Sequence, residues 1–348
     1  MAAPHRIGRL KVHAAVGELD EAVVLRDRIQ ALTRAEIPAA LERAFDALNL
    51  GDLHLRIDRL DIDLGELRAE TLETDLVAAL DRALGPALRA ARGKRLGAVQ
   101  AETAALRSYL ASGVAPPFCG LDFDPAARLR ALAASDPTAF ARLARAASRQ
   151  GIARRRLAAL GQGAMPRGEA RPRDPDPGHP LYIANAGLAL VTPYLPALFE
   201  RLRLLTGKGD APPRVTGFDA ASRAVHLVQY LATGRLDTPE PALALNKLLA
   251  GLPLDTPVAR QIDASPADLE ICKQLLTALI ANWPIIKNSS IDGLRETFLQ
   301  REGRLDRAED RWDLRVQRKA LDVLVDRVPW SFSVIFHRWM QAPIDVTW

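Results

Sequence analysis

Residues 161–180, GQGAMPRGEARPRDPDPGHP, limit what the chain can fold into more than any other segment. They contain five prolines and four glycines and show no apolar periodicity. Proline and glycine interrupt helices and strands, and arginine and aspartate are solvated side chains with no apolar surface to bury. We therefore predict a flexible, partly extended linker at 161–180 that separates the chain into two halves.

Alternating apolar residues predict two strands in the first half. The first strand covers 7–16, where Leu10 and Val12 occupy alternate positions. The second covers 53–64, and its alternation slips by one residue at 58–59. Such a slip predicts a bulge or a change of partner strand at that point.

Apolar residues at helical spacing predict helices between and after these strands. We expect two helices over 22–32 and 37–48, separated by a capping box that begins at Thr33. A longer helix, with its leucines on one face, starts near Leu72, and Gly85–Pro86 should break or kink it.

The second half holds most of the large apolar residues. Leu181–Leu205 is expected to form two helices with a bend at its prolines. Helices that end at Gly234 and Gly251 and a helix that is opened by Ser265 are expected to follow. Beyond Gly303 apolar residues alternate again, which predicts a small antiparallel sheet at the end of the chain.

These patterns divide the chain into four parts. We predict an N-terminal α+β domain over 1–97 and a short helical module over 98–160, followed by the linker at 161–180. The remainder, 181–348, is predicted to be a helical domain that ends in the small sheet. The expected fold class is therefore mainly α with small sheets, an α+β architecture.

Arginine is concentrated beside the linker. Nine arginines and one glutamate give residues 141–173 a net charge of +8, whereas the whole chain carries +5. Such a belt could hold an acidic partner surface or nucleic acid, although a solvated helix face that continues into the linker is the favoured interpretation. Aromatic residues for base stacking are not interleaved with the arginines, which disfavours nucleic acid. The possible partner contacts in this belt are Arg142, Arg145, Arg149, Arg154, Arg155 and Arg156.

Tryptophan is concentrated at the other end of the chain. Four of the five tryptophans fall in residues 312–348. Clustered tryptophans either fill a core or form a docking surface, and we favour the core. Trp330, Trp339 and Trp348 are retained as possible partner contacts.

Candidate catalytic chemistry is weak throughout. The sequence contains no GxSxG, Walker loop, HExxH or dinucleotide-binding glycine pattern, and no nucleophile can be assigned to His226. Asp58, Asp61 and Asp63 alternate with apolar residues along a predicted strand, so Asp61 and Asp63 should face solvent instead of holding a metal. Gly187 is expected to serve close packing or a turn. We assign no catalytic, cofactor-binding or metal-binding residues and predict that the chain is not an enzyme.

The cysteines and the apolar segments indicate the compartment. Cys119 and Cys272 are isolated, so we expect free thiols in a reducing compartment. The first residues lack the apolar core of a signal peptide, and no run of about 18 apolar residues predicts a membrane span. We expect a soluble protein that is made in the cytoplasm.

A series of phrases, in order along the chain, carries a family resemblance. In the first half the phrase is LRIDRLDIDLGEL at 55–67. In the second half the phrases are YIANAGLALVTPYLPALFERLRLL at 182–205, RAVHLVQYLATG at 223–234, LALNKLLAGLPLDTPV at 243–258, NWPIIKNSSIDGLRETFLQREGRL at 282–305, WDLRVQRKALDVLVDRVPWSFSVI at 312–335 and the closing IDVTW. With these phrases the chain resembles the contractile injection system tape measure proteins, which are encoded with phage-tail-like particles.

The resemblance implies a non-enzymatic structural or assembly component whose partners are the inner tube, the baseplate or other particle proteins. It supplies no catalytic or ligand-binding residues. A ruler has to span a length, and a single helix of this chain would reach at most about 520 Å. Because the predicted helices are short and interrupted by proline and glycine, we expect a compact assembly factor. The alternative is a basic nucleic-acid-binding adaptor that acts through the Arg142–Arg173 belt.

Overall fold

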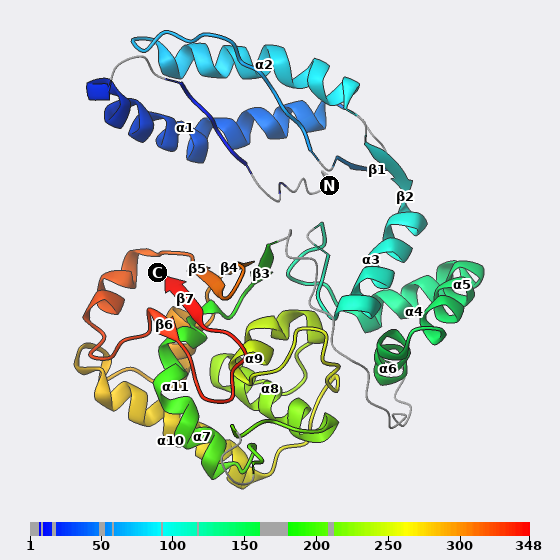
Figure 1. Cartoon of the computed structure of the whole chain (residues 1–348), viewed down its shortest axis with the longest axis vertical. Coiled ribbons are helices and arrows are strands. Elements are labelled where there is room, and N and C mark those ends of the chain that lie inside the picture. The colour runs from blue at the N-terminus through cyan, green and yellow to red at the C-terminus, as the bar shows by residue number, and fades with distance from the viewer. Residues whose placement is uncertain are drawn as a thin grey trace. The chain divides into compact units, whose positions relative to one another are not determined.

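The computed structural model is mainly helical with small sheets, which confirms the predicted fold class (Figure 1). The described residues are 7, 10–15, 19–48, 53–57, 59–91, 93–116, 118–160, 180–207 and 212–348. They form two compact units, Met1–Ala101 and Glu102–Trp348. Residues 161–179 of the predicted linker lie outside the described residues, so the linker stays a prediction.

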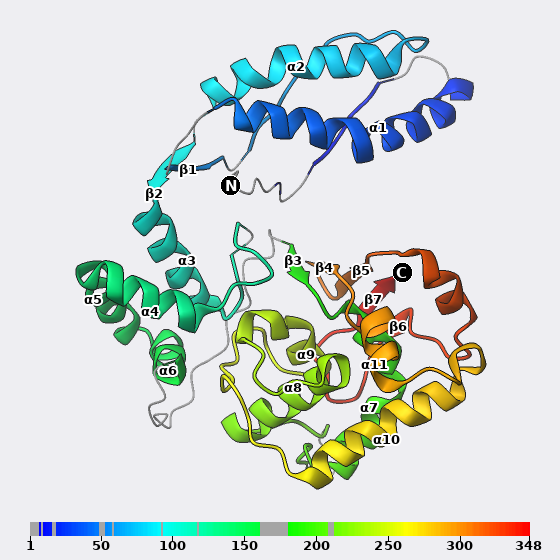
Figure 2. The ribbon, with the colours of Figure 1, turned by 180° about the vertical axis from the view of Figure 1, so that it is seen from behind.

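Two helices, α1 (Leu19–Asp46) and α2 (Leu72–Ala90), build the first unit. They lie side by side in both ribbon views (Figure 1, Figure 2). The predicted leucine face of α2 is confirmed, because it packs against a buried face of α1. The buried residues of this core are Leu32, Ile37, Ala40 and Leu41 from α1 and Leu72, Leu76, Leu80 and Leu84 from α2.

The predicted division between two short helices is wrong, because α1 runs through it. The Oγ1 of Thr33 donates a hydrogen bond to Ile29 O at 2.7 Å within the helix instead of capping a new one. The apolar face continues across this point, and packing against α2 outweighs the local capping signal. Likewise α2 is not broken at Gly85–Pro86, which lies inside it.

The strands of this unit are shorter than predicted. Residues 10–15 form no strand, and Leu10 and Val12 remain exposed. Among the described residues of the second predicted strand, only Leu53–Arg56 form a strand, β1. It pairs antiparallel with β2 (Lys94–Gly97), which the sequence patterns did not indicate. The following residues are irregular but keep their alternation, since Ile62 and Leu64 pack against the helices. Asp58, at the predicted slip, lies outside the described residues.

The helical module consists of α3 (Ala98–Ser112), α4 (Pro125–Ser135), α5 (Pro137–Ser148) and α6 (Gly151–Leu160). An aspartate followed by a proline opens two of these helices, Asp124–Pro125 at α4 and Asp136–Pro137 at α5. Asp124 Oδ1 accepts from the backbone N–H of Ala126 at 2.9 Å, and Asp136 Oδ1 accepts from that of Ala139 at 2.8 Å. The helices enclose their own small core, which includes Leu106, Leu110, Phe123, Leu132 and Leu143.

The C-terminal domain, residues 180–348, alternates short helices with short strands. Its elements are β3 (Leu181–Ile183), the 3-10 helix η1 (Ala186–Tyr194), α7 (Leu195–Arg201), α8 (Phe218–Thr233), η2 (Glu240–Leu243), α9 (Ala244–Leu249), α10 (Pro266–Asn282), η3 (Pro284–Ile286), α11 (Ile291–Leu294), the π-helix η4 (Arg295–Leu299), β4 (Gly303–Arg307), β5 (Trp312–Val316), η5 (Ala320–Arg327), β6 (Val334–Ile335) and β7 (Ile344–Thr347).

The predicted helix ends in this domain are confirmed. Gly234 follows α8 with φ of 71°, and Gly251 closes the turn after α9 with φ of 70°, a region that glycine adopts without steric cost. At the start of α10, Ser265 and Asp268 form a reciprocal capping box.

The prediction of two helices for Leu181–Leu205 is confirmed over 186–201, where η1 and α7 meet at the prolines, and is wrong for the start of the segment. This segment begins with β3, continues as the 3-10 helix η1, and only then becomes α-helical in α7. Gly187 explains the arrangement, because η1 lies directly against the backbone of η4. A Cβ at Gly187 would stand 1.8 Å from Phe298 O and 2.6 Å from Leu299 Cα. The expected role of Gly187 in close packing is confirmed.

The terminal sheet has five strands in the order β3-β4-β5-β7-β6 and is mixed, which corrects the predicted antiparallel sheet. Strands β5 and β7 are parallel, from Trp312↔Ile344 to Arg315↔Thr347. A parallel pair requires a long crossover, and residues 317–343, which carry η5 and β6, supply it. One face of the sheet is buried through Leu305, Leu314 and Ile344.

We predict that Gly187→Ala destabilises the second unit by about 3 kcal/mol or more. The added Cβ would clash with two backbone atoms of η4, which cannot rotate away as a side chain can. Chemical denaturation of the full chain, followed by tryptophan fluorescence, measures the change. The matched control is Gly151→Ala at the start of α6, where an added Cβ meets nothing within 4 Å. An equal effect of the two substitutions would contradict the close-packing role.

Candidate functional site

The arginine belt separates into exposed and buried members. The side chains of Arg142, Arg145, Arg149 and Arg154 are exposed, and that of Arg155 is half-buried. Arg156 differs, because none of its surface is exposed. The remaining belt arginines, beyond 160, lie outside the described residues. The structure therefore places Arg156 in the interior, next in sequence to arginines that face solvent.

Arg156 joins the helical module to the C-terminal domain. Its Nε donates to Glu240 Oε1 at 3.2 Å, and its Nη1 donates to Leu110 O, at the end of α3, at 3.0 Å. Its Nη2 donates to Asp255 O, in the loop after α9. A guanidinium can donate in several directions from one plane, so this single side chain bonds to three segments of the chain.

Glu240 is the acidic centre of the cluster. Its Oε1 also accepts from Lys247 Nζ at 2.6 Å, and its Oε2 accepts from the hydroxyl of Tyr109 at 2.8 Å. Lys247 Nζ donates in addition to Leu254 O at 2.9 Å. Glu240 is 5% exposed and Lys247 and Tyr109 are each 1% exposed, so every charge of the cluster is removed from water.

The pKa values of this buried ionic cluster, formed by Tyr109, Arg156, Glu240 and Lys247, follow from burial and charge. Burial alone would raise the pKa of Glu240, but the charges of Lys247 and Arg156 outweigh burial and lower it. Burial lowers the pKa of Lys247 to about 8, although Glu240 opposes the shift. Burial and the negative charge of Glu240 raise the pKa of Tyr109 well above its ordinary value. The tyrosine hydroxyl therefore stays protonated as a donor.

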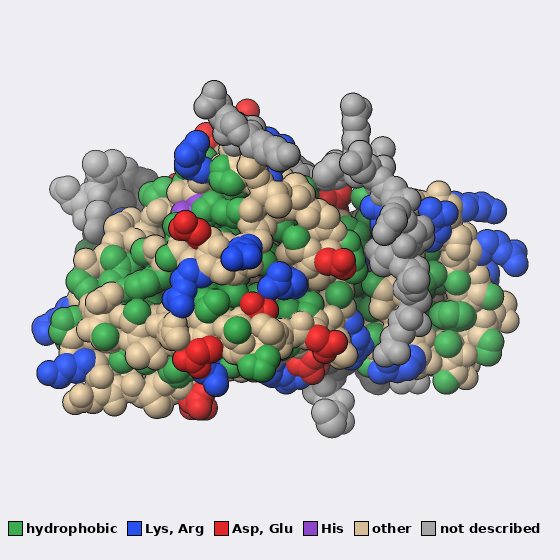
Figure 3. Space-filling view, turned by 90° about the horizontal axis from the view of Figure 1, so that it is seen from below, with side chains coloured by type: hydrophobic (Ala, Val, Ile, Leu, Met, Phe, Trp, Pro, Cys, Tyr) green, Lys and Arg blue, Asp and Glu red, His purple; other side chains and the backbone are tan. Residues whose placement is uncertain are grey.

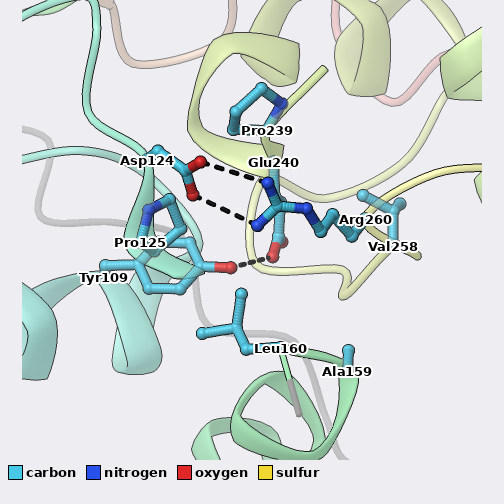
Figure 4. Close-up of a pocket in the computed structure, with 9 residues that line it drawn as sticks. All are labelled: Tyr109, Asp124, Pro125, Ala159, Leu160, Pro239, Glu240, Val258 and Arg260. Carbon is cyan, nitrogen blue, oxygen red and sulfur yellow. Dashed lines mark hydrogen bonds and ion pairs between the residues drawn. The ribbon is translucent and has the colours of Figure 1, made fainter. Parts of the chain in front are cut away.

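A small cavity adjoins the cluster (Figure 4). Glu240 and Tyr109 line it and are joined there by their hydrogen bond, and Asp124 and Arg260, which also line it, form an ion pair of 3.1 Å. Its volume is about 10 Å³, room for no more than a single water molecule. The buried ionic cluster is thus closely packed, and the adjoining cavity does not have the space to bind an organic ligand.

The tryptophans singled out from the sequence are tied into the C-terminal domain. Trp339 is buried, and its Nε1 donates to Leu249 O at 2.9 Å. Trp330 and Trp348 are partly buried and pack against the same core, and Trp330 Nε1 donates to Leu190 O at 3.1 Å. The indole N–H of Trp348 donates to Asp322 Oδ2 at 2.9 Å. Contact with a partner through these three residues stays a prediction.

Other candidate groups form no reactive set. His226 Nε2 lies 2.8 Å from Ala259 O, and no partner of its buried Nδ1 is found among the described residues. Asp61 pairs with Arg59 at 2.8 Å and is exposed, as is Asp63, which confirms that both face solvent. Within the described part of the chain, no three His, Cys, Asp or Glu side chains are placed to hold a metal ion. Cys119 and Cys272 are not joined in a disulfide.

Comparison with protein families decides the affiliation. The family model described as contractile injection system tape measure protein matches residues 4–165 and 161–348. The chain belongs to the contractile injection system tape measure protein family. No curated protein and no solved structure matches it significantly. The family consists of structural particle components and is not an enzyme family, so the chain is a structural component of a contractile injection system.

No helix in the described ranges has both the length and the apolar character that crossing a membrane requires.

The residues that form the buried ionic cluster with Arg156 in this tape measure family member were not singled out from the sequence. A signal for two of them exists, because Glu240 and Lys247 are the charged residues of the phrase EPALALNKLL at 240–249. Their separation of seven residues places them on one face of a helix. The remaining member of the cluster, Tyr109, donates to Glu240 from far away in the sequence and carries no such signal.

We predict that Glu240→Gln destabilises the second unit by about 3–5 kcal/mol, because Arg156 and Lys247 would then be buried without a counter-charge. Urea denaturation of the full chain measures the loss. Asp237→Asn is the matched control, since its partner Arg235 lies in a pair whose side chains are 67% and 52% exposed. The control should lose no more than about 1 kcal/mol. Equal losses would show that the cluster does not hold the module.

We also predict that protonation of His226 destabilises the fold. Burial lowers the pKa of this imidazole below 6.5, partly opposed by its bond to Ala259 O. The unfolded chain therefore takes up the proton first, and the free energy of unfolding falls as the pH drops below about 6.5. His226→Gln, whose amide can still donate to Ala259 O, should reduce this pH dependence.

Burial also lowers the pKa of His337, so part of the dependence should remain in the His226 variant. His13→Gln, at an exposed position of the first unit, is the control. Thermal denaturation across about pH 5 to pH 8 makes the comparison. If His226→Gln and His13→Gln behave alike, the imidazole of His226 does not oppose protonation as its burial implies.

Proposed function

We propose that this chain acts as a folded assembly component of a contractile injection particle, in contact with inner tube or baseplate proteins while the particle is built in the cytoplasm. The family match supports the structural role, and the architecture of the chain favours a folded body over an extended ruler. The observation that carries the choice is the short length of the described helices, of which the longest has 28 residues.

Helix length limits what the described elements can span. The longest described helix, α1, has 28 residues. At 1.5 Å per residue it measures about 42 Å. The helices of the second unit are shorter and end at capped or glycine positions, as α8 does at Gly234. To span the length of the whole chain as a single helix, these separate helices would have to unfold and form one continuous helix.

Buried charge opposes such an extension. The two parts of the second unit are connected by Arg156, Glu240, Lys247 and Tyr109, which bond to one another in the interior. Drawing α6 away from α9 would separate these charges and remove the large apolar core of the C-terminal domain from its packing. The energetic cost favours a body that binds its partners as it is folded.

An insertion within residues 161–179 distinguishes an assembly component from a ruler. A polar insertion of about 60 residues would lengthen a ruler by about 90 Å as helix and by about 200 Å as extended chain. We predict an unchanged distribution of tube lengths in electron micrographs of particles from cells that carry only the insertion variant. Tubes that lengthen in proportion to the insertion would contradict the proposal.

The gene deletion supplies the control for this experiment. Cells without the chain should produce few particles or misassembled ones, and the insertion variant should restore normal particles. Normal particle number and structure in the deletion strain would show that the chain has no assembly role. Thermal denaturation of the purified insertion variant confirms beforehand that both units remain folded.

A further inference from the structure

Four arginines of α5, its C-terminal cap and α6 are exposed. Arg142, Arg145 and Arg149 follow one another at intervals of three and four residues, so they lie along one side of α5 and its C-terminal cap. The opposite side of α5 is buried through Leu143 and its alanine neighbours. Arg154, in the next helix, is also exposed. We call these four residues the arginine face.

This face has no counter-charge on its own helices. Residues 137–160 contain no aspartate or glutamate. In the described ranges, none of the four arginines takes part in an ion pair, whereas many exposed arginines elsewhere do, such as Arg43 with Asp81 and Arg318 with Asp326. The right-hand lobe of the space-filling view, which corresponds to α4–α6, displays basic and apolar side chains and no acidic ones (Figure 3).

The buried ionic cluster holds this face in position. Arg156 lies two residues after Arg154 on α6, and it is bonded to Glu240 and to two backbone carbonyls of other segments. The helix that carries part of the arginine face is thereby fixed to the C-terminal domain. A surface that is ordered before binding loses less conformational entropy when a partner docks.

We propose that the arginine face binds a row of aspartate or glutamate side chains on another protein of the particle. This inference rests on the proposed function, because it names the chemistry of the partner. The spacing of Arg142, Arg145 and Arg149 covers about 10 Å of helix, which matches carboxylates repeated on one side of an acidic helix. Arginine and carboxylate form paired hydrogen bonds of matched geometry.

A protein partner fits this surface better than nucleic acid does. The one aromatic residue of α5 and α6, Phe140, packs against the core of the helical module and does not offer a stacking platform. The face also lacks a helix that could enter a groove, because the arginines lie along the side of a 12-residue helix whose other side is buried.

The test compares two full-length variants of equal charge. The first replaces the arginine face by glutamine, and the second replaces four exposed arginines of the C-terminal domain that take part in no ion pair among the described residues. The control positions are Arg203, Arg315, Arg327 and Arg338. Each variant lowers the net charge by the same amount, so a difference between them reports position and not total charge.

Three probes define the outcome: a helix-forming peptide with glutamates at i, i+3 and i+7, a scrambled peptide of the same composition, and a short DNA duplex. We expect the wild type and the control variant to bind the helical peptide in a salt-sensitive manner. We expect the face variant to bind about 15-fold more weakly, since the three glutamates form three exposed pairs and each pair contributes a factor of about two to three. The scrambled peptide should bind more weakly than the helical one.

Tighter binding of DNA than of the helical peptide, with loss in the face variant, would overturn the proposal in favour of nucleic acid. Equal binding by the two variants would also overturn it, because binding would then follow net charge alone. In cells, the face variant should yield fewer particles than the control variant. If the face variant assembles normally while the gene deletion does not, the docking surface is refuted and the assembly function remains.

Discussion

The second unit depends on one buried interaction, the bonds of Glu240 with Arg156, Lys247 and Tyr109. These residues come from a helix of the N-terminal half, the helix before the linker and two helices of the C-terminal domain. Two cations and one carboxylate in the interior are stable only because backbone carbonyls take up the remaining donors. Removal of Glu240 leaves two buried cations and a buried hydroxyl without their shared carboxylate. The cluster therefore specifies how α3–α6 sit on the C-terminal domain.

The buried ionic cluster links the fold to the proposed role. The family match places the chain among structural components of contractile injection systems. A body whose two parts are connected by buried charge is suited to hold partner surfaces at a constant separation, and it resists extension. Two arginines within a single turn of α6 have different roles. Arg156 bonds inward and anchors the helix to the C-terminal domain, whereas Arg154 faces solvent. Anchoring and docking are thus coupled through one short helix.

Local signals predicted much of the secondary structure. The glycine stop at Gly234 and the helix start at Ser265 act within a few residues, and both were placed correctly. The errors arose where distant packing decides. Thr33 has a capping signal, yet α1 continues because α2 covers its apolar face.

The same limit applies to the site and to the sheet. Strand β3 forms because β4, more than a hundred residues later in the chain, pairs with it. Arg156 could not be distinguished from its neighbours Arg154 and Arg155, because its burial depends on Glu240, which is 84 residues away. Composition marked the arginine belt as a charged surface, but only the tertiary fold separates the anchoring arginine from the exposed ones.

The most direct test of the central claim is amide hydrogen exchange of the chain within isolated assembly intermediates of the particle, compared with the free protein. If the chain works as a folded body, the amides of α6, α8 and α9 should be as protected in the intermediate as they are in solution. Rapid exchange of these helices in the intermediate, with protection only in the free protein, would show that the chain extends during assembly and would contradict this account.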